Sequence, residues 1–178
     1  KGGEEALGLV QTFTGLASLA GGLLAVALPK PKSRTQVICN SLLISMSTEN
    51  FLLAFGQSLP VWCLGAVLGW IFIPLMNASM DSLFRETIPT EVQGRVYSAR
   101  NTLQFFTIPV GYLLGGWLVD EVFVPFMSAQ FPGSLWVSLF GAGKGGGAAL
   151  FLLVIGVLGV LSCLPARWDK HIRALEQQ

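Results

Sequence analysis

Five stretches of this chain are each about 20 residues long and almost free of charged side chains. A helix that crosses a membrane needs about 20 predominantly apolar residues, so each stretch is long enough to span. The predicted spans are residues 6–29, 37–56, 61–84, 96–119 and 147–166. The fold class that follows is all-α: a polytopic membrane helix bundle with five transmembrane helices.

The composition supports an integral membrane protein and excludes several other classes. The chain is 52% hydrophobic and 12% charged, about half the charge of an average soluble domain. Cys39, Cys63 and Cys163 lie in apolar runs, where their spacing fits neither a disulfide framework nor a metal site. The only histidine, His171, lies in the polar tail. We therefore expect no enzymatic activity, no metal, no cofactor and no nucleic-acid partner.

The distribution of basic residues predicts the topology. With five spans and the amino end outside, nine of the 11 Lys and Arg residues face the cytoplasm, as the positive-inside rule requires. These nine are Lys30, Lys32, Arg34, Arg85, Arg95, Arg100, Arg167, Lys170 and Arg173. We expect a multi-pass protein of the cell membrane with a cytoplasmic carboxy tail. The uncharged segment 122–143 has the prolines and aromatics of a chain lying at the outer membrane surface.

Small residues recur at every fourth position in three of the predicted spans. They are Ala17, Gly21 and Ala25 in the first span, Gly65 and Gly69 in the third, and Gly111 and Gly115 in the fourth. Such positions let helix backbones approach closely, which predicts a packed bundle. Pro74 and Pro109 lie inside the third and fourth spans and permit kinks. The glycines of segment 141–147 indicate a flexible lead-in to the fifth span.

Polar side chains share helix faces inside three spans and should point away from lipid. Two explanations remain open: hydrogen bonds between helices, or the lining of a substrate cavity. The residues concerned are Gln11 and Thr14, then Asn77, and then Asn101, Gln104 and Tyr112.

Two groups of charged residues are candidates for a functional role. Glu49 is the one carboxylate well inside a span, where it is either a proton carrier or a hydrogen-bonded structural acid. Asp81 lies near the end of the third span, before a basic hairpin over residues 85–100. We expect Asp81 to pair with Arg85 or Arg95 and to hold that hairpin closed, as a gating contact.

Several segments resemble the carboxy-terminal half of major facilitator superfamily transporters, in the branch of the macrolide-efflux and enterobactin-exporter-like proteins. They are residues 8–25, 74–127 and 141–161. The most specific motifs are P-x-E-x-Q-G-R-V at 89–96, Gly-Tyr-Leu-Leu-Gly-Gly at 111–116 and Phe-x-Pro at 123–125. The basic loop at 28–34 lacks the aspartate and glycine of the family's gating loop.

The resemblance implies that residues 1–178 form spans 8–12 of a twelve-helix transporter, a partial fold whose missing amino-terminal seven spans are a partner of this chain. It implies efflux of a drug- or siderophore-like small molecule, by proton-coupled antiport with alternating access. Gln11, Thr14, Asn77, Asn101, Gln104 and Tyr112 would then face the substrate pathway. Glu49 would lie on a peripheral helix and be structural. The alternative is a non-transporting subunit of a membrane assembly.

Overall fold

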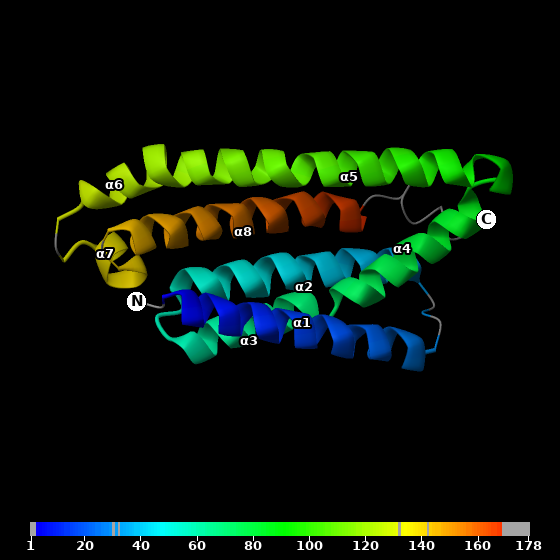
Figure 1. Cartoon of the computed structure of the whole chain (residues 1–178), viewed down its shortest axis with the longest axis horizontal. Helices are drawn as coiled ribbons and strands as arrows, with labels where there is room; N and C mark the ends of the chain where they lie inside the picture. Colours follow the sequence, from blue (N-terminus) through cyan, green and yellow to red (C-terminus); the bar gives the residue numbers. More distant parts are fainter. Residues whose placement is uncertain (1–2, 30, 32, 132, 142, 169–178) are drawn as a thin grey trace. The chain divides into compact units, whose positions relative to one another are not determined.

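The computed structural model describes residues 3–29, 31, 33–131, 133–141 and 143–168, with side chains up to Pro165, and its regular elements are helices (Figure 1). They are α1 (Glu4–Ala27), α2 (Arg34–Phe55), α3 (Leu59–Trp70), α4 (Ile73–Thr87), α5 (Thr90–Leu118), the π-helix η1 (Val119–Phe123), α6 (Val124–Ser128), α7 (Leu135–Phe140) and α8 (Lys144–Trp168). Lys30, Lys32 and the basic tail from residue 169 onward lie outside the described residues.

Five helical segments are long and apolar enough to cross a membrane, which agrees with the predicted number. They are Glu4–Ala27, Arg34–Phe55, Leu59–Thr87, Thr90–Ser128 and Lys144–Pro165. The third combines α3 and α4, and the fourth combines α5, η1 and α6. The all-helical, multi-pass character of the chain is thereby supported by the described residues.

The fourth span was predicted to lie within residues 96–119, and its helix is much longer. It has 39 residues and is about 58 Å long, whereas the hydrocarbon core is about 30 Å thick. Between α5 and α6 the helix widens to a π-turn, in which the N–H of Val124 bonds the carbonyl of Val119. Charged residues mark where the chain leaves the membrane, but they do not stop a helix, and this accounts for the difference.

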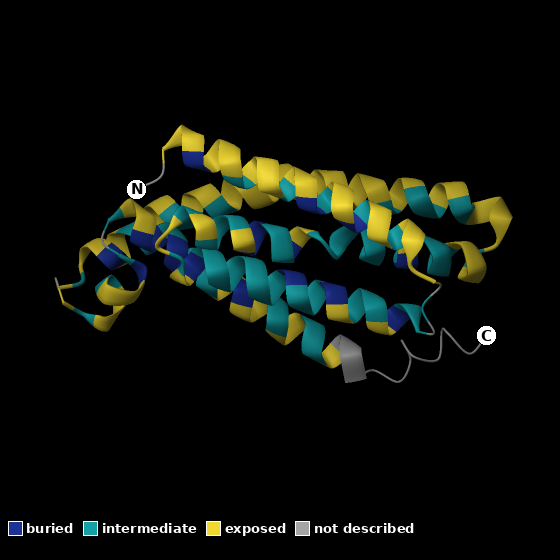
Figure 2. Ribbon diagram, turned by 90° about the horizontal axis from the view of Figure 1, so that it is seen from below, coloured by how far each residue is buried: buried dark blue, intermediate teal, exposed yellow. Residues whose placement is uncertain are grey.

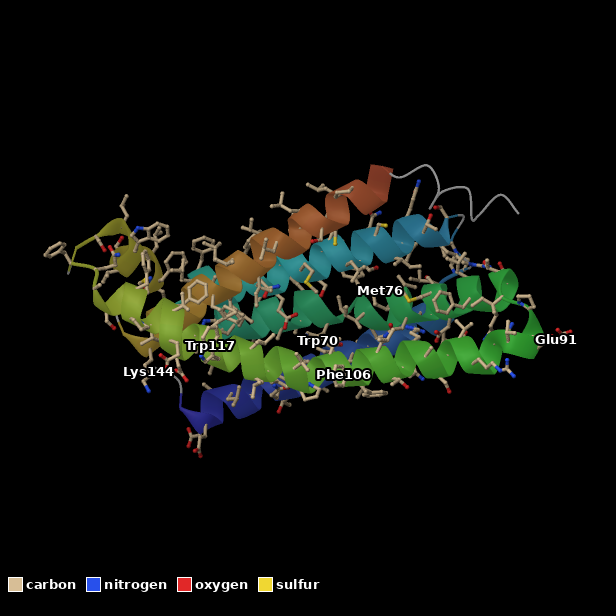
Figure 3. The ribbon with its side chains drawn as sticks, turned by 90° about the horizontal axis from the view of Figure 1, so that it is seen from above. Trp70, Met76, Glu91, Phe106, Trp117 and Lys144 are labelled. Atoms are coloured by element: carbon tan, nitrogen blue, oxygen red, sulfur yellow. The ribbon has the colours of Figure 1, made fainter. Side chains whose placement is uncertain are left out.

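The basic hairpin is also tighter than the predicted loop over residues 85–100. α4 continues to Thr87 and α5 begins at Thr90, so that only residues 88–89 join the two helices. Pro89 caps the start of α5 and Glu91 lies in its first turn (Figure 3), where a carboxylate is favourable. Arg95 and Arg100 therefore project from a helix.

The chain divides into two compact parts. The first holds residues 1–81 and 152–178, and glycines form its helix contacts. Gly65 and Gly69 are buried on α3 against α2, and on α8 Gly156 lies against the side chains of Asn50 and Phe51. Gly21 is one of the few buried residues of α1, which is otherwise largely exposed (Figure 2). The predicted role of these glycines on α1 and α3 is confirmed.

The second part, residues 82–151, includes the corner formed by α6, α7 and the start of α8. The ring of Phe123 lies edge-on to that of Phe151 at 5.4 Å, and Met127 is almost fully buried. Gly146 and Gly147 are buried against the backbones of Gly141 and Val124. Residues 144–147, expected to belong to a flexible lead-in, are the first turn of α8, where Gly146 and Gly147 form close packing contacts.

Candidate functional site

The third span, predicted as one helix, is broken near its middle. α3 ends at Trp70, residues 71–72 form a turn, and α4 begins at Ile73. Figure 3 labels Trp70 and Met76, one on each side of this break. Pro74 has no N–H, so the carbonyl of Trp70 loses the donor that the fourth residue along a helix normally supplies. The third span therefore lacks one regular helical hydrogen bond at the break.

The depth of this break follows from the length of α3. Its 12 residues extend about 18 Å at the usual helical rise. The hydrocarbon core is about 30 Å thick, so a break at that distance from the start of α3 lies near the middle of a membrane. Irregular backbone at this depth is tolerated only where protein or a water-filled cavity surrounds it.

Gly21 of α1 contacts the break directly. A side-chain carbon at this position would overlap the carbonyl oxygen of Ile71 and would lie 3.2 Å from Cδ of Pro74. The backbone of α1 therefore approaches a peptide carbonyl of the turn as closely as only glycine permits. This contact fixes the position of the bend against α1.

The carboxyl group of Glu49 on α2 lies beside Trp70, the last residue of α3 before the break. The indole N–H of Trp70 donates a 2.9 Å hydrogen bond to Oε1 of Glu49. Gly69 makes room for this acid: a Cβ at Gly69 would lie 2.6 Å from Cβ and 2.8 Å from Oε2 of Glu49. Trp70 is 37% exposed and Glu49 is half-buried. Glu49, Gly69 and Trp70 are together called the Glu49 site below.

The elements around the Glu49 site carry little charge. α3 has no charged residue, and neither has the described part of α8 from 152 to 165. The only basic residue of α2 is Arg34, which is 15 positions from Glu49 and thus about 22 Å away along the helix. Among the described residues of these elements, no fixed cation compensates the carboxyl group.

The six predicted pathway residues lie in both parts of the chain. In the first part, Gln11 and Asn77 are exposed, whereas Thr14 is half-buried and donates its hydroxyl to the carbonyl of Val10. In the second part, Asn101, Gln104 and Tyr112 are exposed on α5. That all six line one pathway stays a prediction.

Contacts of Gln93 and Arg100 join the two helices of the hairpin between α4 and α5. The side-chain amide of Gln93 donates to the carbonyls of Arg85 and Ile88 at 3.2 and 2.8 Å. The guanidinium of Arg100 lies 5.4 Å above the ring of Phe84, which also meets Tyr97 edge-on.

The predicted gating pair itself remains a prediction. Asp81 is half-buried, one helical turn before the exposed Arg85, and Arg95 is exposed on α5. Asp81→Asn in the complete protein should change the balance of inward- and outward-facing states if the pair forms. We would measure this balance by cysteine accessibility from each side, and equal accessibility in both proteins would contradict the pairing.

The Gln93 contacts lead to a testable prediction about the hairpin. Gln93→Ala should lower the free energy of unfolding by about 1 kcal/mol, because the carbonyl of Arg85 in the last turn of α4 and that of Ile88 in the connection each lose a donor. Thermal unfolding of the purified protein measures the change. Ser98→Ala, at an exposed position of the same helix, is the matched control and should leave the stability unchanged.

The sequence did not predict the Trp70–Glu49 bond, although it singled out Glu49. Pro74 signals a break, but helical periodicity does not fix how two helices are rotated against each other. Comparison with known protein families, with curated proteins and with solved structures gave no match for this chain.

Proposed function

We propose that the chain is the carboxy-terminal membrane part of a secondary transporter, which exports a drug- or siderophore-like small molecule in exchange for protons. The observation that carries the proposal is the break in the third span beside an intramembrane carboxyl group. Secondary transporters place substrate and ion sites near the bilayer midplane, where discontinuous helices offer free backbone groups. The residues that resemble major facilitator superfamily exporters support the same assignment.

The packing of the described helices supports a larger bundle. α5 buries none of its residues, although Leu103, Phe106 and Tyr112 are large and more than 60% exposed. Such side chains require lipid or further helices around them. In the proposed transporter, seven preceding spans supply those helices, and the two halves rock around a central site.

The second candidate is a non-transporting subunit of a membrane assembly, which the same exposed helix favours. In such a subunit, the exposed apolar surface of α5 and the glycine contacts would have no role beyond packing the helices of the assembly. The two candidates differ in whether the protein moves a solute.

The test is efflux by the complete protein, expressed in cells that lack their main exporters. Cells should accumulate less of a macrolide (erythromycin) or of a catecholate siderophore (enterobactin) when they express it, and a protonophore should abolish the difference. Gln104→Ala should change which probe is exported at a normal protein level, because Gln104 is expected to face the pathway. Unchanged accumulation of both probes, together with co-purification of a stoichiometric membrane partner, would favour the assembly subunit.

The topology is tested independently of transport. Single cysteines at Thr90 and Phe131, in a protein without the three native thiols, should react with a membrane-impermeant maleimide from opposite sides. Both residues are exposed, one at the start of α5 and the other between α6 and α7. Thr90 should react only from the cytoplasmic side. Reaction of both from the same side would contradict the five-span arrangement.

A further inference from the structure

We propose that Glu49 is a proton-binding site inside the membrane, and that its charge state determines how firmly Trp70 holds the end of α3 to α2. The inference deepens the proposed function, since a proton-driven transporter needs such a site. The binding of the proton, however, is a property of the Glu49 site alone and can be measured without transport.

The first argument is the shortage of partners for an ionised carboxyl group. A carboxylate has about four acceptor positions, and the indole N–H of Trp70 occupies one of them. Neighbouring polar groups on α2 are engaged elsewhere: the hydroxyl of Thr48 and the amide of Asn50 donate to backbone carbonyls of their own helix. An isolated carboxylate is costly away from water, so the neutral acid fits this site.

The second argument is the absence of a competing charge on the elements packed against the site. On α3 the only titratable side chain is Cys63, and on the part of α8 from 152 to 165, which packs on α2, it is Cys163; Lys144 lies in the first turn of α8, eight residues before that part. On α1, which packs on α3, the titratable groups are Glu4 and Glu5 in the first turn. On α2 itself they are Arg34 and Cys39. Because the described elements around Glu49 supply no cation, we infer that a proton neutralises its carboxyl group.

The third argument connects this proton to the break in the third span. Trp70 is the last residue of α3, and the next residue, Ile71, presents its carbonyl to Gly21. Hydrogen bonds to ionised acceptors are about twice as strong as those between neutral groups. Loss of the proton therefore tightens the bond from Trp70, and uptake weakens it beside the bend. Proton exchange at Glu49 thus acts on the joint between α3 and α4.

This assignment departs from the structural role that the family resemblance implies for Glu49. The resemblance places its span at the periphery, and the structure adds two facts: the acid has no fixed cation on the described elements around it, and its partner is the residue at the break. A site beside the substrate pathway can still bind the coupling ion.

The test is infrared difference spectroscopy of the complete protein in lipid, between acidic and alkaline pH. The carbonyl band of a neutral carboxyl group should be present at low pH and lost at high pH, and it should be absent in Glu49→Gln. In Trp70→Phe the band should move to higher frequency because the indole donor is missing. Glu91→Gln, at an exposed position in the first turn of α5, should leave the band unchanged.

Two results would overturn the proposal. Identical spectra of the wild type and Glu49→Gln would mean that no proton binds there, and a band that persists to alkaline pH would mean a permanently neutral, structural acid. If Glu49→Gln does not fold, a shift of the carboxyl band in Trp70→Phe assigns the band to Glu49. An unshifted band in Trp70→Phe would then overturn the proposal. Proton binding without efflux would contradict the transporter alone, whereas efflux without the band would contradict this inference alone.

Discussion

Replacing Gly21 with alanine is expected to destabilise the protein strongly, while the same replacement at the adjacent Gly22 should have little effect. The methyl group at position 21 would overlap the carbonyl oxygen of Ile71, a backbone atom that cannot rotate away. Overpacking of this kind costs typically about 1–3 kcal/mol, and a clash with backbone belongs at the upper end. At Gly22, outside the neighbouring backbone of its own helix, no described atom lies within 4 Å of the added carbon.

The measurement is thermal unfolding of the complete protein in detergent, together with efflux of the two probes. Gly21→Ala should lower the unfolding temperature and reduce efflux, because α1 must move away from the bend to admit the methyl group. Gly22→Ala should match the wild type in both assays, and its higher helix propensity excludes a general effect of alanine in α1. Equal stability of the two variants would show that α1 does not approach the third span at residue 71.

The outcome distinguishes two roles for the break. If the bend is only an irregularity, Gly21→Ala should lower stability and leave the efflux per folded molecule unchanged. If the bend changes during transport, efflux per folded molecule should fall as well, because the contact with α1 is part of the moving joint.

The number of spans could be predicted from the sequence, but their ends could not. Hydropathy and the placement of Lys and Arg report on the membrane boundary, which fixes how many segments cross. The helix around the fourth span continues past that boundary at both ends, from Thr90 to Ser128. No proline lies between Glu91 and Arg100, and Glu91, Arg95 and Arg100, which were expected in a loop, lie on α5.

The helix contacts could be predicted where spacing carries the information. Gly65 and Gly69 repeat every fourth position and are buried against α2, as expected. Gly111 follows the same pattern, yet a side-chain carbon at this position would have no described atom within 4 Å apart from the neighbouring backbone of its own helix. The pattern identifies a face that permits close packing, and a partner helix decides whether it is used.

The candidate site was only half predictable for the same reason. An acid inside an apolar run is conspicuous, so Glu49 could be selected from the sequence alone. Its bond to Trp70 joins residues 21 positions apart on different helices and depends on the rotation of both. The absence of a side chain at Gly69, which makes room for the acid, has meaning only once that rotation is known.

Gly146→Ala should have the second large effect, at the corner where α8 begins. A methyl group there would overlap the carbonyl oxygen of Gly141 and lie 3.1 Å from Cε of Met127, which is 2% exposed. Gly141 has a φ of 84°, a backbone conformation that favours glycine. We expect a loss of stability on the order of 1–3 kcal/mol.

The adjacent Gly145→Ala is the control, because no atom lies within 4 Å of the added carbon and alanine favours the first turns of α8. Limited proteolysis between α6 and α7 provides the measurement, since Phe131 in that connection is 84% exposed. Cleavage should accelerate in Gly146→Ala and remain at the wild-type rate in Gly145→Ala. If both variants are cleaved like the wild type, the glycines are the flexible lead-in that their composition indicates, and the segment between the fourth and fifth spans does not form a packed corner. Faster cleavage of Gly146→Ala than of Gly145→Ala would instead show that the lead-in is ordered by backbone contacts. Such contacts form only because glycine has no side chain.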